Sequence, residues 1–439
     1  MPVFPLLSSC IAWLVLSSLS LIAAEALPVL PPPSANAGKS GTYEVQTKVA
    51  GCTYFVCVPQ SYSASAAAGL HLFFHGQNGQ KGASYFGQFK NELLEPFCLI
   101  GINMCYADGD NLKDTAGKVR AAQEAVLQVT ADYRVVPGRE VVGCFSGGGG
   151  PCGQWYAAAG KTRGIGWPFS VLALYGANFW KPAVAGPPTG WMVGLAKDEM
   201  GLGQPTLYAS QTARFGEVLR LAPQFGLDQR FIVPDGSHGV HPPEVAATAR
   251  IFKRMDLVYG QFLVPADYSE KPLAAVVEQA NAGALGAAQQ ALSKLKDPKL
   301  AERATALTTV IDQRAQALIA LLTDLVDHDP LLAAHYAGLV GERLKKHPRE
   351  AELKPLLDRL GKSRQQVAAA EAAWKALAAG WADVLAGGPR LSAKGATLLQ
   401  QITSQAGATS ELGTMASELL TLPVAADAPR SGGLHPGGK

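Results

Sequence analysis

The chain has 439 residues, which is long enough for two or three domains, each with a sizeable hydrophobic core. Its 38 basic and 35 acidic side chains nearly balance, giving a net charge of +3, and no basic stripe runs along it. This charge distribution argues against nucleic acid as a partner.

The N-terminus has the pattern of an export signal. Residues 1–26 carry one charged side chain, Glu25, and include the short apolar segment Ile11–Ala24. Ala24-Glu25-Ala26 has the small-x-small form of a signal-peptidase site. The usual Lys or Arg near the start is missing, and a box resembling that of lipoproteins ends at Cys10, before the apolar segment. We expect a secreted or periplasmic protein with residues 1–26 cleaved; a retained anchor or a lipid-modified Cys10 is the alternative.

Residues 27–42 contain several Pro and Ser residues and are predicted to be a linker. From residue 43 to 264, apolar or β-branched runs alternate with helix-like segments. This alternation predicts an α/β domain with a mostly parallel sheet covered by helices on both faces. The predicted strands are Tyr43–Val49, Tyr54–Val58, Leu70–Phe74, Cys98–Met104, Glu140–Cys144, Phe169–Leu174, Trp191–Leu195 and Phe231–Val233, and the predicted helices include Leu112–Asp132 and Thr206–Leu221.

The composition changes near residue 265. From there to residue 422 the chain is rich in Ala, Leu, Gln, Lys and Glu, and apolar residues recur at three- and four-residue steps from Leu300 to Leu325. Asp297-Pro298, Asp329-Pro330 and His347-Pro348 mark helix ends and starts. We predict an all-α helical array of about six helices, and a disordered tail over residues 423–439.

Residues 143–150, Gly-Cys-Phe-Ser-Gly-Gly-Gly-Gly, follow a predicted strand and precede a helix-like stretch. A strand, a serine, a group of glycines and then a helix is typical of a nucleophile elbow, in which the serine lies on a strained turn. Gly148 supplies one of the two small residues that this turn needs, and Cys144 takes the place of the other. A glycine-rich solvent loop is the alternative.

A nucleophilic serine needs a histidine as base and an acid to orient that histidine. In folds with a nucleophile elbow, the three residues follow along the chain in the order Ser, acid, His. The candidate base after Ser146 is then His238, in a small-residue loop past the last predicted strand. His241 precedes two prolines and is predicted to start a helix. Asp198 follows the strand ending at Leu195 and is the preferred acid over its neighbour Glu199.

The oxyanion of the tetrahedral intermediate requires backbone N–H donors. Gly147, directly after the nucleophile, is one candidate donor. The other is the N–H of Gln77, in the loop that follows the predicted third strand. His75, at the end of that strand, is predicted to support the loop and not to act as a base.

These motifs, together with the segment Tyr54–Pro59, resemble those of α/β-hydrolases. Within that superfamily the chain resembles secreted esterases of the poly(3-hydroxybutyrate) depolymerase and feruloyl esterase kind, over about residues 43–262. The resemblance implies hydrolysis of carboxylic esters through a Ser146–His238–Asp198 triad and an acyl-enzyme, with no cofactor. Cys144 in place of the elbow glycine and Gln77 where depolymerases often have cysteine leave the substrate open.

The resemblance also implies a pairing of the cysteines. Its second strand runs antiparallel beside the fourth, which would bring Cys52 to Cys105 and Cys57 to Cys98. The remaining pair, Cys144 and Cys152, would join the elbow to its helix, with buried thiols as the alternative. With Cys10 set aside, six cysteines remain, and an even set agrees with export.

Other chemistries find little support. The cysteine spacings do not suit zinc, no H-E-x-x-H motif occurs, and Gly160-Lys161-Thr162 ends a helix-like segment without the earlier glycine of a phosphate loop. The rival functions are a serine peptidase of the same fold and a binding or scaffold protein with an inert hydrolase domain. The helical array could cap the active site, mediate dimerisation, or dock on a protein or cell-envelope partner. Four aromatic residues, either pocket-lining or core, are Trp155, Tyr156, Phe179 and Trp180.

Overall fold

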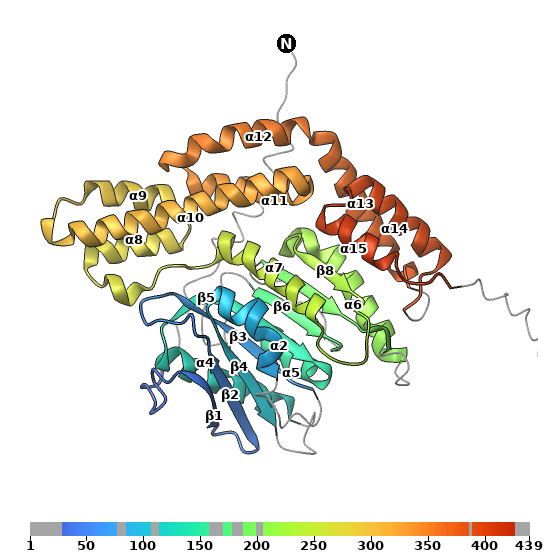
Figure 1. Ribbon diagram of the computed structural model, residues 1–439, viewed down its shortest axis with the longest axis horizontal. Helices are drawn as coiled ribbons and strands as arrows, with labels where there is room; N and C mark the ends of the chain where they lie inside the picture. The colour runs from blue at the N-terminus through green and yellow to red at the C-terminus, as the bar shows by residue number, and fades with distance from the viewer. Residues whose placement is uncertain are drawn as a thin grey trace, which may run out of the picture.

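The computed structural model describes residues 29–76, 85–106, 114–157, 170–177, 188–198, 205–385 and 389–425. Its centre is an eight-stranded sheet with the order β1-β2-β4-β3-β5-β6-β7-β8 (Figure 1). β2 pairs antiparallel with β1 and β4, and the pairs from β4 to β8 are parallel. The strands are β1 (Gly41–Gln46), β2 (Cys52–Val58), β3 (Ala68–Phe74), β4 (Leu99–Tyr106), β5 (Val135–Phe145), β6 (Ser170–Tyr175), β7 (Thr189–Gly194) and β8 (Gln229–Ile232).

Each of the eight strands overlaps a strand predicted from the sequence. The second strand lies antiparallel beside the fourth, as the resemblance to α/β-hydrolases implies, and the remaining order is that of a mostly parallel, twisted sheet. The expected fold class, an α/β-hydrolase fold followed by a helical region, is therefore confirmed.

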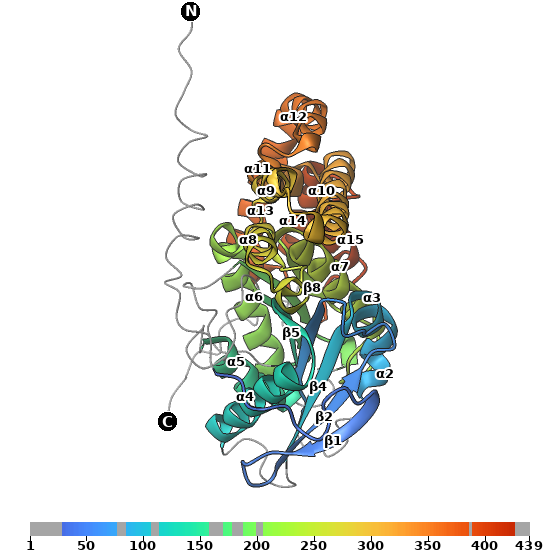
Figure 2. The same ribbon diagram turned by 90° about the vertical axis from the view of Figure 1, so that its left-hand side faces the viewer.

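Helices cover both faces of the sheet because side chains along a strand alternate between the faces. Leu72 and Phe74 of β3 enter one hydrophobic core, and Phe73 between them enters the other. Figure 2 shows the two layers on either side of the sheet. The first core lies under α4 (Thr115–Asp132), α5 (Gly149–Ala157) and α6 (Pro205–Phe225), and the second under α2 (Phe86–Phe89), the π-helical turn η2 (Lys90–Leu94), α3 (Glu95–Phe97) and α7 (Pro242–Tyr259).

The helical region contains more helices than expected. Its described residues form α8 (Lys271–Asn281), α9 (Leu285–Lys294), α10 (Ala301–His328), α11 (Pro330–Leu344), α12 (Leu353–Lys362), α13 (Arg364–Gly380), α14 (Ala393–Ala406) and α15 (Glu411–Leu419). The stripe from Leu300 to Leu325 forms α10, as predicted. The Asp-Pro signal at Asp329 is also confirmed, since its carboxylate accepts the N–H of Leu332 at 3.0 Å and caps α11. Short turns, such as the one at Gly283, divide the region further because they allow antiparallel helix pairs.

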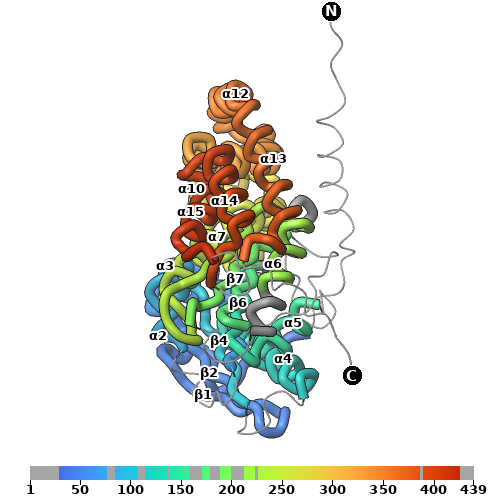
Figure 3. Tube along the Cα trace, turned by 90° about the vertical axis from the view of Figure 1, so that its right-hand side faces the viewer, coloured from blue at the N-terminus to red at the C-terminus, as the bar shows by residue number. Residues whose placement is uncertain are grey.

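The helical region packs against α6, α7 and β8 (Figures 1 and 3). The indole N–H groups of Trp374 and Trp381 donate to carbonyl oxygens of α6, at 3.1 and 2.6 Å. Arg314 of α10 donates to the Asp256 and Gly260 carbonyls at the end of α7. The array therefore covers the β8 edge of the sheet and the end where its parallel strands begin.

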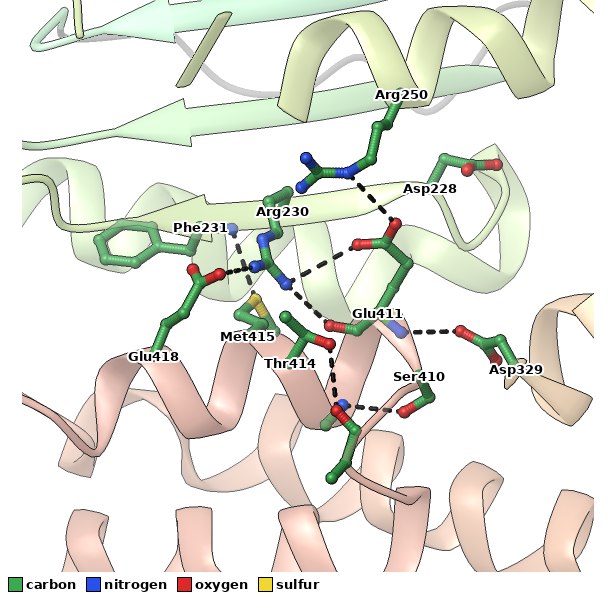
Figure 4. Close-up of polar contacts among 12 residues, drawn as sticks. Asp228, Arg230, Phe231, Arg250, Asp329, Ser410, Glu411, Thr414, Met415 and Glu418 are labelled. Carbon is green, nitrogen blue, oxygen red and sulfur yellow. Dashed lines mark hydrogen bonds and ion pairs between the residues drawn. The ribbon is translucent and has the colours of Figure 1, made fainter. Parts of the chain in front are cut away.

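An ion-pair network joins α15 to the edge strand β8 (Figure 4). The guanidinium of Arg230 is 2% exposed and lies 2.5 Å from Glu418 and 3.7 Å from Glu411. The Phe231 N–H donates to the sulfur of Met415 at 3.4 Å. An open strand edge is a template for aggregation, and α15 covers this one.

The expected disulfides are absent: all six cysteines between Cys52 and Cys152 are recorded as thiols. The strand register gives the reason for two of the three pairs. Cys52 faces Tyr106 instead of Cys105, and this offset of one residue places the two cysteines on opposite faces of the sheet. Cys57 faces Gly101, three residues beyond Cys98.

The chain ends of the described part are held by hydrogen bonds. In the expected linker, the Ser34 N–H and hydroxyl both donate to Asp132 of α4, each at 2.6 Å. At the start of the expected tail, Ala425 N–H donates to the Leu391 carbonyl at 2.7 Å. The expected signal segment, residues 1–26, and residues 426–439 lie outside the described residues. Among the helices described, none has the length and apolar character needed to cross a membrane.

Candidate active site

Ser146 occupies a sharp turn between β5 and α5. Its φ is +50°, a left-handed value that only Cys98 and Lys346 share among the described residues other than glycine. Phe145, just before it, is still extended, with φ −122° and ψ 136°. A non-glycine residue in the left-handed region is strained, and a strained serine between a strand and a helix is the geometry of a nucleophile elbow.

Two glycines, Gly148 after the serine and Gly76 just after β3, permit this turn because other parts of the chain approach them closely. A Cβ on Gly148 would lie 2.1 Å from the Phe74 carbonyl oxygen, so α5 can pass β3 only with glycine there. A Cβ on Gly76 would lie 2.8 Å from Cβ of Ser146. Gly76, which precedes the predicted second oxyanion donor in the chain, therefore lies against the serine.

The loop after β8 brings His238 to the elbow. The imidazole of His238 lies 4.4 Å from the ring of Phe145, centroid to centroid, with the planes at 35°. Phe145 is bonded to Ser146 in the chain, so the predicted base and the predicted nucleophile lie at the same end of the sheet. No other imidazole of the described residues has a ring contact recorded with Phe145.

Asp198 follows β7, next to the loop that carries His238. Its N–H donates to the Gly236 carbonyl at 3.1 Å, and the N–H of Lys197 donates to the Pro234 carbonyl at 3.0 Å. These bonds join the acid-bearing segment to the histidine loop. The Asp198 side chain is exposed. The ammonium of Lys197 pairs with Asp235 at 2.5 Å, which gives Asp235 a structural partner. Glu199 lies outside the described residues.

The oxyanion region is partly described. Gly147 lies in the single helical turn Ser146–Gly148, directly after the nucleophile. Gln77 lies outside the described residues, but Gly76 before it touches the elbow. His75 is buried and its Nδ1 is within hydrogen-bond distance of the Gly76 carbonyl. Burial lowers the pKa of His75 to about 4, so its imidazole is neutral at pH 7 and supports the loop as predicted.

Cys144 and Cys152 lie beneath the elbow, one on β5 and one on α5. Both are fully buried, and the two side chains are within hydrogen-bond contact. Burial, with the neighbouring Cys152 next, raises the pKa of the Cys144 thiol. The side chain at the small-residue position of the elbow thus contacts the helix that follows, although no bond joins the sulfurs.

Two other sets of residues have structural roles. Trp155 and Tyr156 are buried in the first hydrophobic core, and Trp155 Nε1 donates to Glu140 at 3.2 Å. Phe179 and Trp180 lie outside the described residues. His241 starts α7, as predicted, and its N–H donates to Glu244 at 2.7 Å.

The described residues contain no group of three or more His, Cys, Asp or Glu side chains placed to hold a metal ion. Sequence reasoning missed Phe145 and Glu244 as neighbours of the histidine loop. The sequence position of Phe145, directly before Ser146, could have indicated that its side chain lies near His238, because the base must lie close to the serine.

No protein-family model matches the chain, and no curated protein sequence matches it significantly. Similar solved structures include a thermostable esterase, with a TM-score of 0.32 and 11% identity over 48% of this chain and 59% of that one. The apo form of Thermogutta terrifontis esterase 2 has a TM-score of 0.30 and 10% identity over 50% and 93% of the two chains. Esterase PE8 has a TM-score of 0.31 and 13% identity over 45% and 96%.

The match thus spans less than two thirds of the thermostable esterase, and about half of this chain in each case. Strand order and the turn at Ser146, and not these likenesses, define the fold as that of an α/β-hydrolase.

Proposed function

We propose that the protein is a secreted serine hydrolase that cleaves carboxylic esters. The observation that carries this proposal is the left-handed φ of Ser146, on a turn whose neighbouring ring touches the imidazole of His238. Strain at a single polar residue persists where the surrounding structure imposes it, and such sites are enriched in catalytic groups.

In the proposed reaction, the Ser146 hydroxyl attacks the ester carbonyl carbon while His238 accepts the hydroxyl proton. The carbonyl oxygen becomes an oxyanion that the N–H groups of Gly147 and Gln77 stabilise. His238 then gives its proton to the leaving alcohol, which departs and leaves an acyl-serine. Water attacks this acyl group with His238 again acting as base, and the acid and the serine are released.

Asp198 is proposed to orient His238. Support comes from its place after β7 and from the backbone hydrogen bonds between its segment and the histidine loop. Glu199 is the competing acid. Asp198→Asn and Glu199→Gln separate the two: the variant that lowers kcat by orders of magnitude identifies the orienting carboxylate.

The leading test is hydrolysis of 4-nitrophenyl acetate and butyrate by the mature protein. We expect Ser146→Ala and His238→Ala each to reduce kcat at least about 1,000-fold with the fold intact. A Ser146→Ala protein with wild-type turnover would overturn the proposal. Faster cleavage of peptide amides than of short esters would favour a peptidase, and absent hydrolysis of both would favour a scaffold protein.

The substrate class within esters is a further part of the proposal. The resemblance makes hydroxybutyrate and feruloyl esters the classes to compare, while Cys144 and Gln77 depart from the depolymerase pattern and leave polymer specificity open. A panel of acyl-chain lengths, a feruloyl ester and a hydroxybutyrate oligomer, compared by kcat/KM, would rank these classes.

A further inference from the structure

The loop that carries His238 has to pass the ends of two strands to bring the imidazole to the elbow. It follows β8, which is separated from β5 by β6 and β7. Three strand spacings of roughly 4.8 Å put the two strands about 14 Å apart. The histidine loop must therefore extend over the ends of β6 and β7. Its His238 ring then contacts Phe145, at the end of β5.

Phe145 is held in place from several directions. Its side chain lies on the same face of the sheet as the second core, opposite to Cys144, because side chains alternate along β5. A Cβ on Gly76 would lie 3.0 Å from Cδ1 of Phe145, so the backbone of Gly76 lies against one side of the ring. The ring of Tyr85 lies 6.2 Å away.

The contact with His238 occupies a face of the imidazole. A centroid distance of 4.4 Å at 35° is a tilted stack, so the two rings are in van der Waals contact. An imidazole in a loop otherwise has several side-chain rotamers available. A fixed ring against one face leaves fewer of them.

We propose that Phe145 is the positioning residue of this site: its ring sets the orientation of the His238 imidazole toward the Ser146 hydroxyl. The inference rests on the proposed function, since it concerns the same nucleophile and base. The bond that joins Phe145 to Ser146 means that one rigid turn places both the nucleophile and the surface on which the base rests.

The first test measures 4-nitrophenyl acetate hydrolysis by Phe145→Leu, which removes the ring and keeps an apolar side chain. We expect kcat to fall about 10- to 100-fold, as for a misplaced catalytic group, with KM changed less than about twofold. Phe145→Tyr keeps the ring and should retain kcat within about threefold. The matched control is Phe97→Leu, another partly buried ring of the same core, which packs on Phe252 and has no recorded contact with the site.

A double-mutant cycle distinguishes positioning from a general structural effect. The rate of labelling by a fluorophosphonate is measured for Phe145→Leu, His238→Ala and the double variant. If the ring acts through the imidazole, adding Phe145→Leu to His238→Ala changes the rate by less than about twofold. An equal loss in both backgrounds, or a wild-type kcat for Phe145→Leu, would overturn the inference.

The two proposals fail differently. If wild-type hydrolysis does not depend on Ser146, the proposed function is wrong and the cycle cannot be constructed. If hydrolysis depends on Ser146 and His238 but not on Phe145, only the positioning role is wrong. Thermal unfolding of each variant confirms that the compared proteins are folded.

Discussion

The Phe74 carbonyl oxygen lies 2.1 Å from the place where a Cβ on Gly148 would be. That approach explains why the second residue after the proposed nucleophile is glycine: α5 passes the end of β3 at backbone contact distance. The glycine thus permits the turn that gives Ser146 its left-handed φ.

Gly148→Ala should consequently be destabilising and inactivating. The added methyl group would meet a backbone oxygen, which cannot rotate away, and overpacking of this kind costs about 3 kcal/mol or more. Urea denaturation and 4-nitrophenyl ester hydrolysis measure the two effects. Gly150→Ala is the control, since its Cβ would meet nothing closer than Thr115 at 3.8 Å. It should be neutral or stabilise α5 by up to about 1 kcal/mol. A Gly148→Ala protein as stable and active as the wild type would contradict this account of the turn.

Glu411 should be a major contributor to the attachment of the helical region. Its carboxylate lies 2.8 Å from Arg254 and also pairs with Arg230, both nearly buried. Removing one member of a buried ion pair leaves the other charges uncompensated, and Glu411→Gln is expected to cost about 3–5 kcal/mol in unfolding free energy. Glu371→Gln, from the exposed pair with Lys375, should cost less than about 1 kcal/mol. Equal, small effects for both variants would show that the network contributes little.

The same carboxylate predicts a pH dependence. Burial would raise the pKa of Glu411, but the neighbouring arginines outweigh it and hold the pKa below the ordinary value. A carboxyl whose pKa is depressed in the folded state stabilises the protein above its unfolded pKa, and this contribution is lost as the pH falls through the folded pKa. The stability difference between wild type and Glu411→Gln should therefore be largest near pH 7 and shrink below about pH 4. A difference that stays constant from pH 7 to pH 3 would contradict this reading.

A chain that ends at Val264 should not fold into a soluble hydrolase. It would lack Trp381, whose ring packs 4.9 Å from Phe215 and 5.1 Å from Phe231, and would expose the β8 edge. We expect this truncation to aggregate, whereas a chain ending at Ala425 should behave like the full-length protein. Size-exclusion chromatography and thermal unfolding compare the two. A monomeric, cooperatively unfolding product ending at Val264 would show that the α/β domain is independent of the helices.

Cys144 and Cys152 should form a disulfide under oxidising conditions, because their buried thiols are neighbours beneath the elbow. With glutathione disulfide as oxidant, the two thiols lose two hydrogens and two glutathione thiols are produced. Alkylation in denaturant without a reducing agent, followed by peptide mapping, should then find this pair protected. Cys57 and Cys98 should be alkylated, since Cys57 faces Gly101. Alkylation of all four after oxidation would exclude the bridge.

Local pattern was sufficient to predict the strands, the elbow and the histidine loop. Strand-forming runs are short and separated by turn residues, and the serine, its glycines and His238 lie in or next to such turns. The predictions of the Cys52–Cys105 and Cys57–Cys98 disulfides failed because they depended on strand register, where a shift of one residue moves a side chain to the other face. No local pattern reports register between strands that pair across the sheet.

Contacts between segments far apart in the chain could not be predicted from the sequence either. Arg230 and Glu418 are 188 positions apart, and nothing around either indicates the other. The position of the helical region over the β8 edge follows from such contacts.

The most direct test of the central claim is the site of covalent labelling. The mature protein is treated with a fluorophosphonate, digested, and examined by tandem mass spectrometry. We predict a single phosphonyl adduct on Ser146 and much slower, still measurable, labelling of Ser146 in His238→Ala, since the imidazole activates the hydroxyl. An adduct on another residue, or an unlabelled Ser146 in a protein that hydrolyses esters, would contradict the account.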